Sequence, residues 1–175
     1  VNLIGEHIDY NGGLVLPAAI PLGVTTQLAA RKDPTLRIAS DRFPDVYEGD
    51  GADAPQWAMH AVGALFYARE AGLLSAGADL HIASTLPDGA GLSSSAALLV
   101  SILKAARDLG STGISDIEIA LLAQRIENEF IGVPCGIMDQ IAVAIARPGE
   151  AVALDTKTLR YETAPLFSDA RFVVI

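Results

Sequence analysis

The sequence has 175 residues, of which 51% are apolar and 19% are charged, which is enough for one domain with a sizeable core. Its formal net charge is −9 and its Lys and Arg residues are scattered, so a surface for nucleic acid or for an anionic membrane is not expected. No apolar run reaches the ~18 residues of a membrane span. The single cysteine, Cys135, excludes an internal disulfide and favours the reducing cytoplasm.

The first half of the chain predicts several strands, one helix and a further strand. Apolar and β-branched runs predict strands, in chain order, at 1–4, 15–20, 23–31, 35–40 and 45–48. A loop punctuated by Gly and Asn separates the first two of them, over residues 5–13. A helix is expected over 54–71, between a capping Asp53 and Gly72, and a strand follows at 78–84.

The second half is predicted to be mostly helical before it returns to strands. After a Pro- and Gly-containing loop at 85–92, a helix is expected over 93–109. A second helix is expected to begin at a Ser115–Glu118 capping box and to end near Phe130, and a third is expected over 136–146. Strands are expected at 150–155, 159–163 and 170–175. Because strands and helices mix without regular alternation, the fold class is expected to be α+β, a mixed β-sheet packed with helices. The strand-like first and last runs and the absence of an initial Met predict a fragment of a longer protein.

Residues 86–97, LPDGAGLSSSAA, are the strongest local signal. Gly89 and Gly91 permit a tight turn between the expected strand and helix and let a ligand approach the backbone. The helix that follows offers free N–H groups and the positive end of its dipole, which suit a phosphate, and Ser93, Ser94 and Ser95 add hydroxyl donors. The segment is neither a Walker A loop nor a dinucleotide fingerprint. Spacing alone therefore leaves a plain strand-to-helix turn as an equal alternative.

Two acids lie in settings without a charged neighbour one helical turn away. Glu127 is expected near the C-terminal end of its helix, where the dipole disfavours negative charge, whereas Glu129 can pair with Arg125. Asp139 is surrounded by uncharged residues at the equivalent positions. For Glu127 this setting suggests an outside partner such as a cation, and for Asp139 it suggests a hydrogen-bond partner or a functional role. The alternatives are an acid on a half-exposed flank for Glu127 and a first-turn helix acid for Asp139.

Residues 6–11, EHIDYN, place two carboxylates, an imidazole, a phenol and an amide in one loop. Carboxylates accept pairs of hydroxyl hydrogen bonds, so this loop suits a sugar, and the alternative is a polar surface hairpin. A metal site is less favoured because the other histidines, His60 and His81, have no ligand spacing and are interpreted as structural. Trp57 and Phe66 are expected in the core.

Three segments together resemble the galactokinase branch of the GHMP kinase family. VNLIGEHIDYNGG (1–13) is similar to the galactokinase signature, LPDGAGLSSSAA (86–97) to the family's phosphate-binding motif, and GVPCGIMDQ (132–140) to the segment with the catalytic aspartate. Their order and spacing match over essentially the whole chain. The resemblance implies the N-terminal domain of the family, with a fold similar to the second domain of ribosomal protein S5. It also implies transfer of the γ-phosphate of ATP to the C1 hydroxyl of galactose in the cytoplasm.

The resemblance implies roles for residues at matching positions. Glu6, His7 and Asp9 would hold sugar hydroxyls, Gly136 and Asp139 would close around the anomeric end, and Asp139 would be the catalytic base. Ser95 and Glu127 would hold Mg²⁺. The ATP phosphates would be cradled by Gly89, Ala90, Gly91, Leu92, Ser93, Ser94 and Ser95.

Some parts of the family pattern differ or are expected outside the sequence. Ile8 stands where many galactokinases carry Thr, and the Ile form is familiar from N-acetylgalactosamine kinases, so a kinase for that sugar or for L-arabinose is the alternative. A non-catalytic sensor that binds galactose and ATP is a further class, which the intact serines and Asp139 disfavour. A catalytic arginine is expected before Val1, and a C-terminal domain beyond Ile175. The fragment alone is therefore expected to be inactive, and a monomer is favoured.

Overall fold

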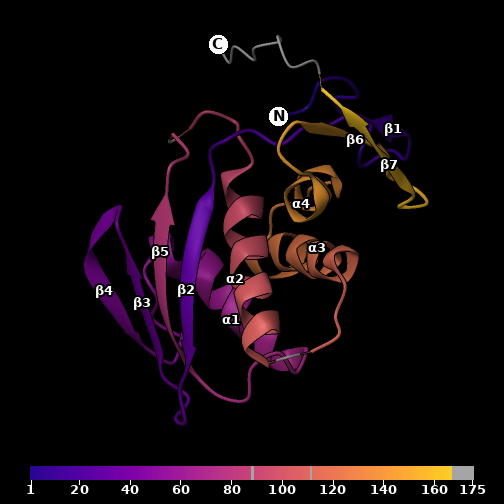
Figure 1. The fold of residues 1–175 in the computed structure, drawn as a ribbon. Coiled ribbons are helices and arrows are strands. Elements are labelled where there is room, and N and C mark those ends of the chain that lie inside the picture. Colours follow the sequence, from indigo (N-terminus) through magenta and orange to yellow (C-terminus); the bar gives the residue numbers. More distant parts are fainter. Residues whose placement is uncertain (88, 111, 167–175) are drawn as a thin grey trace.

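The structure is a computed structural model that describes residues 1–87, 89–110 and 112–166. Within these ranges the chain forms a four-stranded sheet, four α-helices and a smaller three-stranded sheet beside the last helix (Figure 1). The expected α+β fold is confirmed. No helix in the described ranges is both long and apolar enough to cross a membrane.

The larger sheet has the strand order β2–β5–β3–β4. The antiparallel pairs are β2 (Val24–Ala30) with β5 (Ala78–Ser84) and β3 (Leu36–Ser40) with β4 (Phe43–Gly49). The two inner strands, β3 and β5, run parallel: β4 brings the chain back to the end of the sheet where β3 began, and the segment that contains α1 leads from there into β5 at the same end. Alternate residues of these strands, such as Ile38, are fully buried and form one wall of the core.

The helices form layers against one face of this sheet. α1 (Met59–Glu70) and α2 (Ser94–Gly110) lie next to the strands, whereas α3 (Asp116–Arg125) and α4 (Met138–Ile145) lie on the far side of α2 (Figure 1). The long helix α2 is therefore enclosed on both sides, and its apolar face is buried throughout. The largest fully buried aliphatic side chains include Leu65, Leu99, Ile102, Leu103, Ile119 and Ile141.

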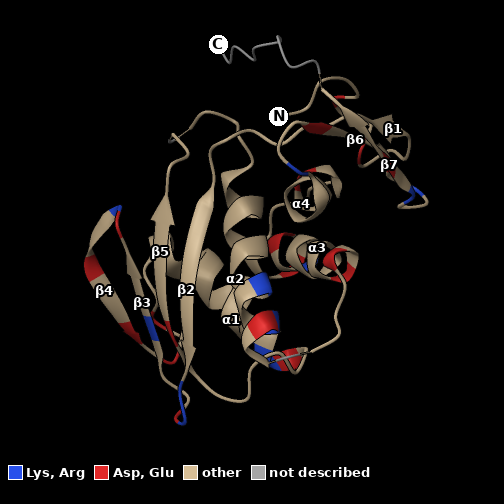
Figure 2. Cartoon of the chain, in the orientation of Figure 1, with Lys and Arg blue, Asp and Glu red and all other residues tan. Residues whose placement is uncertain are grey.

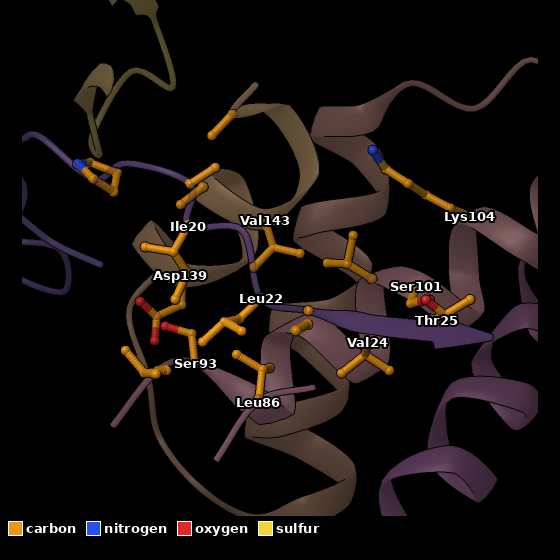
Figure 3. Close-up of a pocket in the computed structure, with 18 of the residues that line it drawn as sticks. Ile20, Leu22, Val24, Thr25, Leu86, Ser93, Ser101, Lys104, Asp139 and Val143 are labelled. Carbon is orange, nitrogen blue, oxygen red and sulfur yellow. The ribbon is translucent and has the colours of Figure 1, made fainter. Parts of the chain in front are cut away.

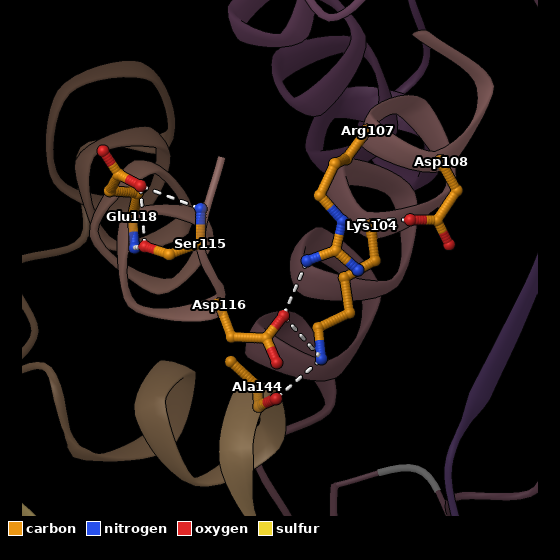
Figure 4. Close-up of polar contacts among 7 residues, drawn as sticks. All are labelled: Lys104, Arg107, Asp108, Ser115, Asp116, Glu118 and Ala144. Atoms are coloured by element: carbon orange, nitrogen blue, oxygen red, sulfur yellow. Dashed lines mark hydrogen bonds and ion pairs between the residues drawn. The ribbon is translucent and has the colours of Figure 1, made fainter. Parts of the chain in front are cut away.

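A cluster of charged side chains links α2, α3 and α4 (Figure 4). Lys104 Nζ donates to the carbonyl oxygen of Ala144 at the end of α4, at 2.6 Å, and lies 3.3 Å from Asp116 Oδ1. Arg107 Nη1 lies 2.7 Å from the same Asp116 Oδ1 atom. Burial by itself would raise the pKa of Asp116, but Arg107 and Lys104 outweigh it and the pKa is lowered. Because the last carbonyls of a helix have no partner within it, Lys104 stabilises the position of α4.

The smaller sheet joins the beginning of the chain to residues near its end. Its order is β1 (Leu14–Val15), β6 (Glu150–Asp155) and β7 (Tyr161–Pro165), and both pairs are antiparallel. Thr156 Oγ1 also accepts a hydrogen bond from the backbone N–H of Gly13, at 3.1 Å. These contacts fix the loop at 5–13 beside α4.

Several local predictions agree with the structure. The strand at 78–84 is found at those residues, and the Ser115–Glu118 capping box begins α3 as expected. The predicted strand at 1–4 is wrong: only Asn2 forms a bridge, to Pro17. The chain turns away at Gly5, which is buried with a φ of 106°, so strand pairing stops there.

Other helix boundaries also differ from the predictions. The 54–71 helix opens with a 3-10 turn, Gln56–Ala58, and Asp53 does not cap it but accepts a hydrogen bond from the Tyr47 hydroxyl at 3.0 Å. The final helix starts at Met138 rather than at 136. Phe66 is 55% exposed, so its predicted core position is wrong. The predicted strand at 170–175 lies outside the described residues.

Trp57 is partly buried and its ring stacks on Phe43, with 5.0 Å between centroids. The structural interpretation of His81 is compatible with its contact to Asp41, since Nε2 lies 2.9 Å from Oδ1 of that residue. Burial lowers the pKa of His60, against the opposing charge of Glu127.

Candidate active site at the N-terminus of α2

The loop between β5 and α2 has a backbone that most residues avoid. Gly89 and Gly91 have φ angles of 66° and 64°, and Ser93, which is not a glycine, has a φ of 53°. Such strain in a non-glycine residue tends to occur at functional sites. A Cβ atom built on Gly91 would point into open space, so the backbone there is accessible to a ligand. α2 begins at Ser94, and its first-turn N–H groups have no partner within the helix.

No Lys or Arg occurs between Leu86 and Leu103, and Figure 2 shows β2 and the first half of α2 without charged residues. A cation does reach the loop from elsewhere: the guanidinium of Arg42, in the turn between β3 and β4, donates to the carbonyl oxygen of Leu86. Arg42 was missed by the sequence reasoning. It lies 44 positions before Leu86, and no local pattern signals that contact.

The structure brings Ser95 and Glu127 together. Ser95 Oγ, in the first turn of α2, donates to Glu127 Oε1 at 2.5 Å. Glu127 is only 6% exposed, so the alternative of an acid on a half-exposed flank is wrong. The helix that was predicted to continue to Phe130 changes at Ile126–Ile131 into a π-helix, a local widening that is frequent at functional sites.

Two further side chains surround the Glu127 carboxylate, and the sequence reasoning did not select either. Gln140 Nε2 donates to Glu127 Oε2, and Cys135 Sγ lies 3.7 Å from the same oxygen. Burial, followed by the charge of Glu127, raises the pKa of the Cys135 thiol to about 11. Gln140 had one sequence signal, since it and Asp139 are the two polar residues of the otherwise apolar α4.

These groups fit a magnesium ion whose remaining ligands would come from the phosphates of a nucleotide. The groups that donate to Glu127 are a hydroxyl, an amide and a thiol, all neutral, so its negative charge is available to a cation. Mg²⁺ is commonly held by one or two carboxylates together with substrate phosphates rather than by a complete protein cage. No group of three or more His, Cys, Asp or Glu residues within the described ranges could hold a metal.

Asp139 lies in the first turn of α4 beside Ser93 (Figure 3). Burial is the largest influence and raises the pKa of its carboxyl group. A hydrogen bond with the Ser93 side chain lowers it, whereas the charges of Asp9 and Glu127 raise it further. The carboxylate is therefore more basic than an ordinary aspartate, in the direction that general-base chemistry requires.

The opening loop packs against the segment before α4. A Cβ atom on the buried Gly136 would overlap the carboxylate of Asp9, so these two residues are in close contact. Glu6 and His7 are exposed and are held within their own loop. Asn2 Nδ2 donates to Glu6 Oε1, and the Tyr10 hydroxyl lies 2.9 Å from His7 Nδ1. Of the three expected sugar ligands, the structure places Asp9 nearest to the Asp139 segment.

A cavity of about 560 Å³ adjoins this site, between β2, α2 and α4. Asp139 and Ser93 lie at one end and Lys104 at the other, with apolar side chains such as Leu22 and Val143 between them (Figure 3). The loop, the Ser95–Glu127 pair and Asp139 thus converge near the N-terminus of α2.

Comparison with known proteins identifies the family of the chain. The family model described as GHMP kinases N terminal domain matches residues 58–147, more than half of the chain. The chain belongs to the GHMP kinase family. A second model, the galactokinase galactose-binding signature, matches residues 1–30.

Curated relatives of this family member are galactokinases. The chain is 46% identical over 171 residues to galactokinase of Streptomyces coelicolor, covering 94% of this chain and 44% of the relative. It is 40% identical over 173 residues to galactokinase of Enterococcus faecalis, covering 94% and 45%. The chain thus spans less than half the length of these relatives.

Solved structures show the same fold. A crystal structure of Lactococcus lactis galactokinase complexed with galactose superimposes with a TM-score of 0.87 at 37% identity, covering 94% of this chain and 44% of the other. Mevalonate kinase of Methanococcus jannaschii has a TM-score of 0.75 at 18% identity, covering 97% and 54%. That second likeness concerns the fold alone.

Proposed function

We propose that this chain is the N-terminal domain of a galactokinase, which transfers the γ-phosphate of ATP to the C1 hydroxyl of galactose and releases galactose 1-phosphate and ADP. The observation that carries the proposal is the convergence of three distant segments at the N-terminus of α2: the 89–95 loop, Glu127 and Asp139. The signature match over residues 1–30 and the identity to proteins named galactokinase support galactose as the acceptor.

The nucleotide would bind on the loop before α2. The backbone N–H groups there and the hydroxyls of the serines would hold the phosphates, because the loop has no cationic residue of its own. Ser95 and Glu127 would hold Mg²⁺, which would neutralise charge on the transferred phosphoryl group. The proposed phosphate-binding residues are Gly89, Ala90, Gly91, Leu92, Ser93, Ser94 and Ser95.

The sugar would bind between the opening loop and the segment before α4. Asp9 would accept hydrogen bonds from sugar hydroxyls, with Glu6 and His7 adding polar contacts from the exposed part of the loop. The lack of a side chain at Gly136 lets Asp9 approach this segment. A site built to hydrogen-bond hydroxyls discriminates between sugars because unsatisfied buried groups are costly.

Asp139 would accept the proton of the C1 hydroxyl as its oxygen forms a bond to the γ-phosphorus. The bond from that phosphorus to the bridging oxygen of ADP breaks at the same centre, and ADP leaves. The raised pKa of Asp139 makes its carboxylate a better proton acceptor than an ordinary aspartate. The chemistry thus relies on position and charge, without a covalent enzyme intermediate.

The remaining proposals concern the whole protein. We propose that residues 1–175 form one domain and that a second domain, corresponding to the rest of the length of the relatives, completes the site. A cytoplasmic location is proposed because the free thiol of Cys135 would stay reduced there.

The test is a sugar panel with the full-length protein, ATP and Mg²⁺. ADP release is measured with galactose, N-acetylgalactosamine, L-arabinose and glucose, and phosphorus NMR identifies the phosphorylated position. Galactose is expected to have the highest kcat/KM, with phosphate at C1. Preference for N-acetylgalactosamine or L-arabinose would identify a sibling kinase. Binding of galactose and ATP without turnover would identify a sensor.

A further inference from the structure

The carboxylate of Glu127 is held on both of its oxygens. Ser95 Oγ donates to Oε1, and Gln140 Nε2 donates to Oε2. Gln140 is itself 1% exposed. Its Nε2 also lies 3.4 Å from Cys135 Sγ. The amide of Gln140 therefore uses both of its hydrogens within the small group formed by Glu127 and Cys135.

The other end of the Gln140 amide is not satisfied. Its Oε1 is buried and has no hydrogen-bond partner within the described residues. Turning the amide around would place this oxygen against the Glu127 carboxylate, where two acceptors repel, so the observed orientation is set by Glu127. A buried acceptor without a donor reduces stability. An apolar residue of the same shape would fill this position without that cost, so packing does not explain the glutamine.

We propose that Gln140 is a positioning residue for the cation site. It anchors Glu127 Oε2 and so directs Oε1 towards Ser95, and these two residues would together hold the divalent cation. This inference rests on the proposed function, in which Ser95 and Glu127 hold the Mg²⁺ of ATP. Groups that orient a metal-binding carboxylate from behind typically change metal affinity about 10–100-fold when they are removed.

The position of Gln140 in the chain gives it a second consequence. It directly follows Asp139 in the first turn of α4, and Asp139 lines the cavity while Gln140 is directed to Glu127. One rigid helical turn thus sets the cation-binding carboxylate and the proposed base relative to each other. The Gln140 contact is to Oε2, so it would leave Oε1 and the Ser95 hydroxyl to hold the cation.

The test measures cation binding rather than turnover. Mn²⁺ is titrated into the full-length protein with saturating ADP, and free Mn²⁺ is followed by electron paramagnetic resonance; ADP without protein gives the baseline. Gln140→Met keeps the size of the side chain and removes the amide. We expect it to weaken Mn²⁺ affinity tenfold or more. A melting curve of the metal-free variant checks that it folds, because removal of the amide relieves the unsatisfied Oε1 but also takes a donor away from the buried Glu127 carboxylate.

Gln124→Met is the matched control. Its Nε2 donates to the backbone oxygen of Cys135 at 3.1 Å, so it supports the same segment without donating to Glu127. Its Mn²⁺ affinity should match that of the parent. Gln140→Leu is a second variant with the same expectation, in case the methionine variant does not fold.

Three results would overturn the inference. Parent-like Mn²⁺ affinity in a folded Gln140 variant would show that the amide does not position Glu127. An equal loss in Gln124→Met would show a general disturbance of the segment. If the parent binds Mn²⁺ no more tightly than the Glu127→Gln variant, there is no cation site at Glu127. That outcome alone would also count against the proposed function.

Discussion

Replacement of Asp139 by Asn tests the proposed base with the smallest change in shape. The amide fills the same volume at the start of α4, and its oxygen can still accept a hydrogen bond from Ser93. What disappears is the ability to take up the proton of the C1 hydroxyl. We therefore expect the full-length variant to bind galactose and ATP as the parent does and to lose turnover.

The size of this loss follows from the setting of the carboxylate. A positioned general base contributes about 10²–10⁴-fold in rate, which corresponds to about 3–5.5 kcal/mol of transition-state stabilisation. Asp139 lies at the edge of a largely apolar cavity, and burial raises its pKa. Water is therefore a poor substitute for the missing base, and a loss in the upper half of this range, about 10³-fold or more, is expected.

The same substitution should not reduce stability. The pKa of Asp139 in the folded protein lies above its ordinary value of 3.8, so ionisation of this carboxyl group destabilises the fold. That penalty is complete above the folded-state pKa and disappears below 3.8. Asp139→Asn removes it. The variant should melt at an equal or higher temperature than the parent at neutral pH, and the difference should vanish in acid.

The assay combines calorimetry for both substrates, a coupled measurement of ADP release and thermal melts at two pH values. Asp108→Asn is the control, since Asp108 lines the far end of the same cavity and the same charge is lost. Its turnover should match the parent. Turnover of Asp139→Asn within a few-fold of the parent would refute the role of Asp139 as base and leave it a helix-turn acid.

Three further predictions follow from the geometry. Gly91→Val adds a β-branched side chain where φ is 64° and the backbone faces open space. In calorimetry, ATP affinity should fall at least tenfold while galactose affinity is kept. Unchanged ATP affinity would contradict the assignment of this loop to the phosphates. Gly136→Ala should displace Asp9 and weaken galactose rather than ATP; equal effects on both ligands would argue against a sugar contact there. Asp116→Asn should lower stability at pH 7 by about 1 kcal/mol or less, since the pair is partly exposed. Because the pKa of Asp116 is lowered, this stabilisation is complete above its unfolded-state pKa and is lost in acid, so melts of variant and parent should converge there.

The sequence by itself determined the features that depend on near neighbours. The strand at 78–84, the Ser115 capping box and the loop-to-helix transition at 89–94 each rest on residues within a few positions of one another. The local signal failed where the chain is constrained from a distance. Residues 1–4 have strand-forming side chains, yet the chain turns at Gly5, where φ is 106°. A Cβ there would stand only 2.9 Å from the Leu14 carbonyl oxygen, so the turn requires a glycine.

Only the tertiary structure decided what surrounds Glu127. Its own helix showed an acid without a partner, and three-dimensional packing supplied Ser95 from 32 positions away and Gln140 from 13 positions away. The π-helical segment at 126–131 that contains it has no distinct composition that marks it in the sequence. These partners are set by the way α2, α3 and α4 pack, and the free energy of that packing is spread over the whole buried core, so no local pattern records it.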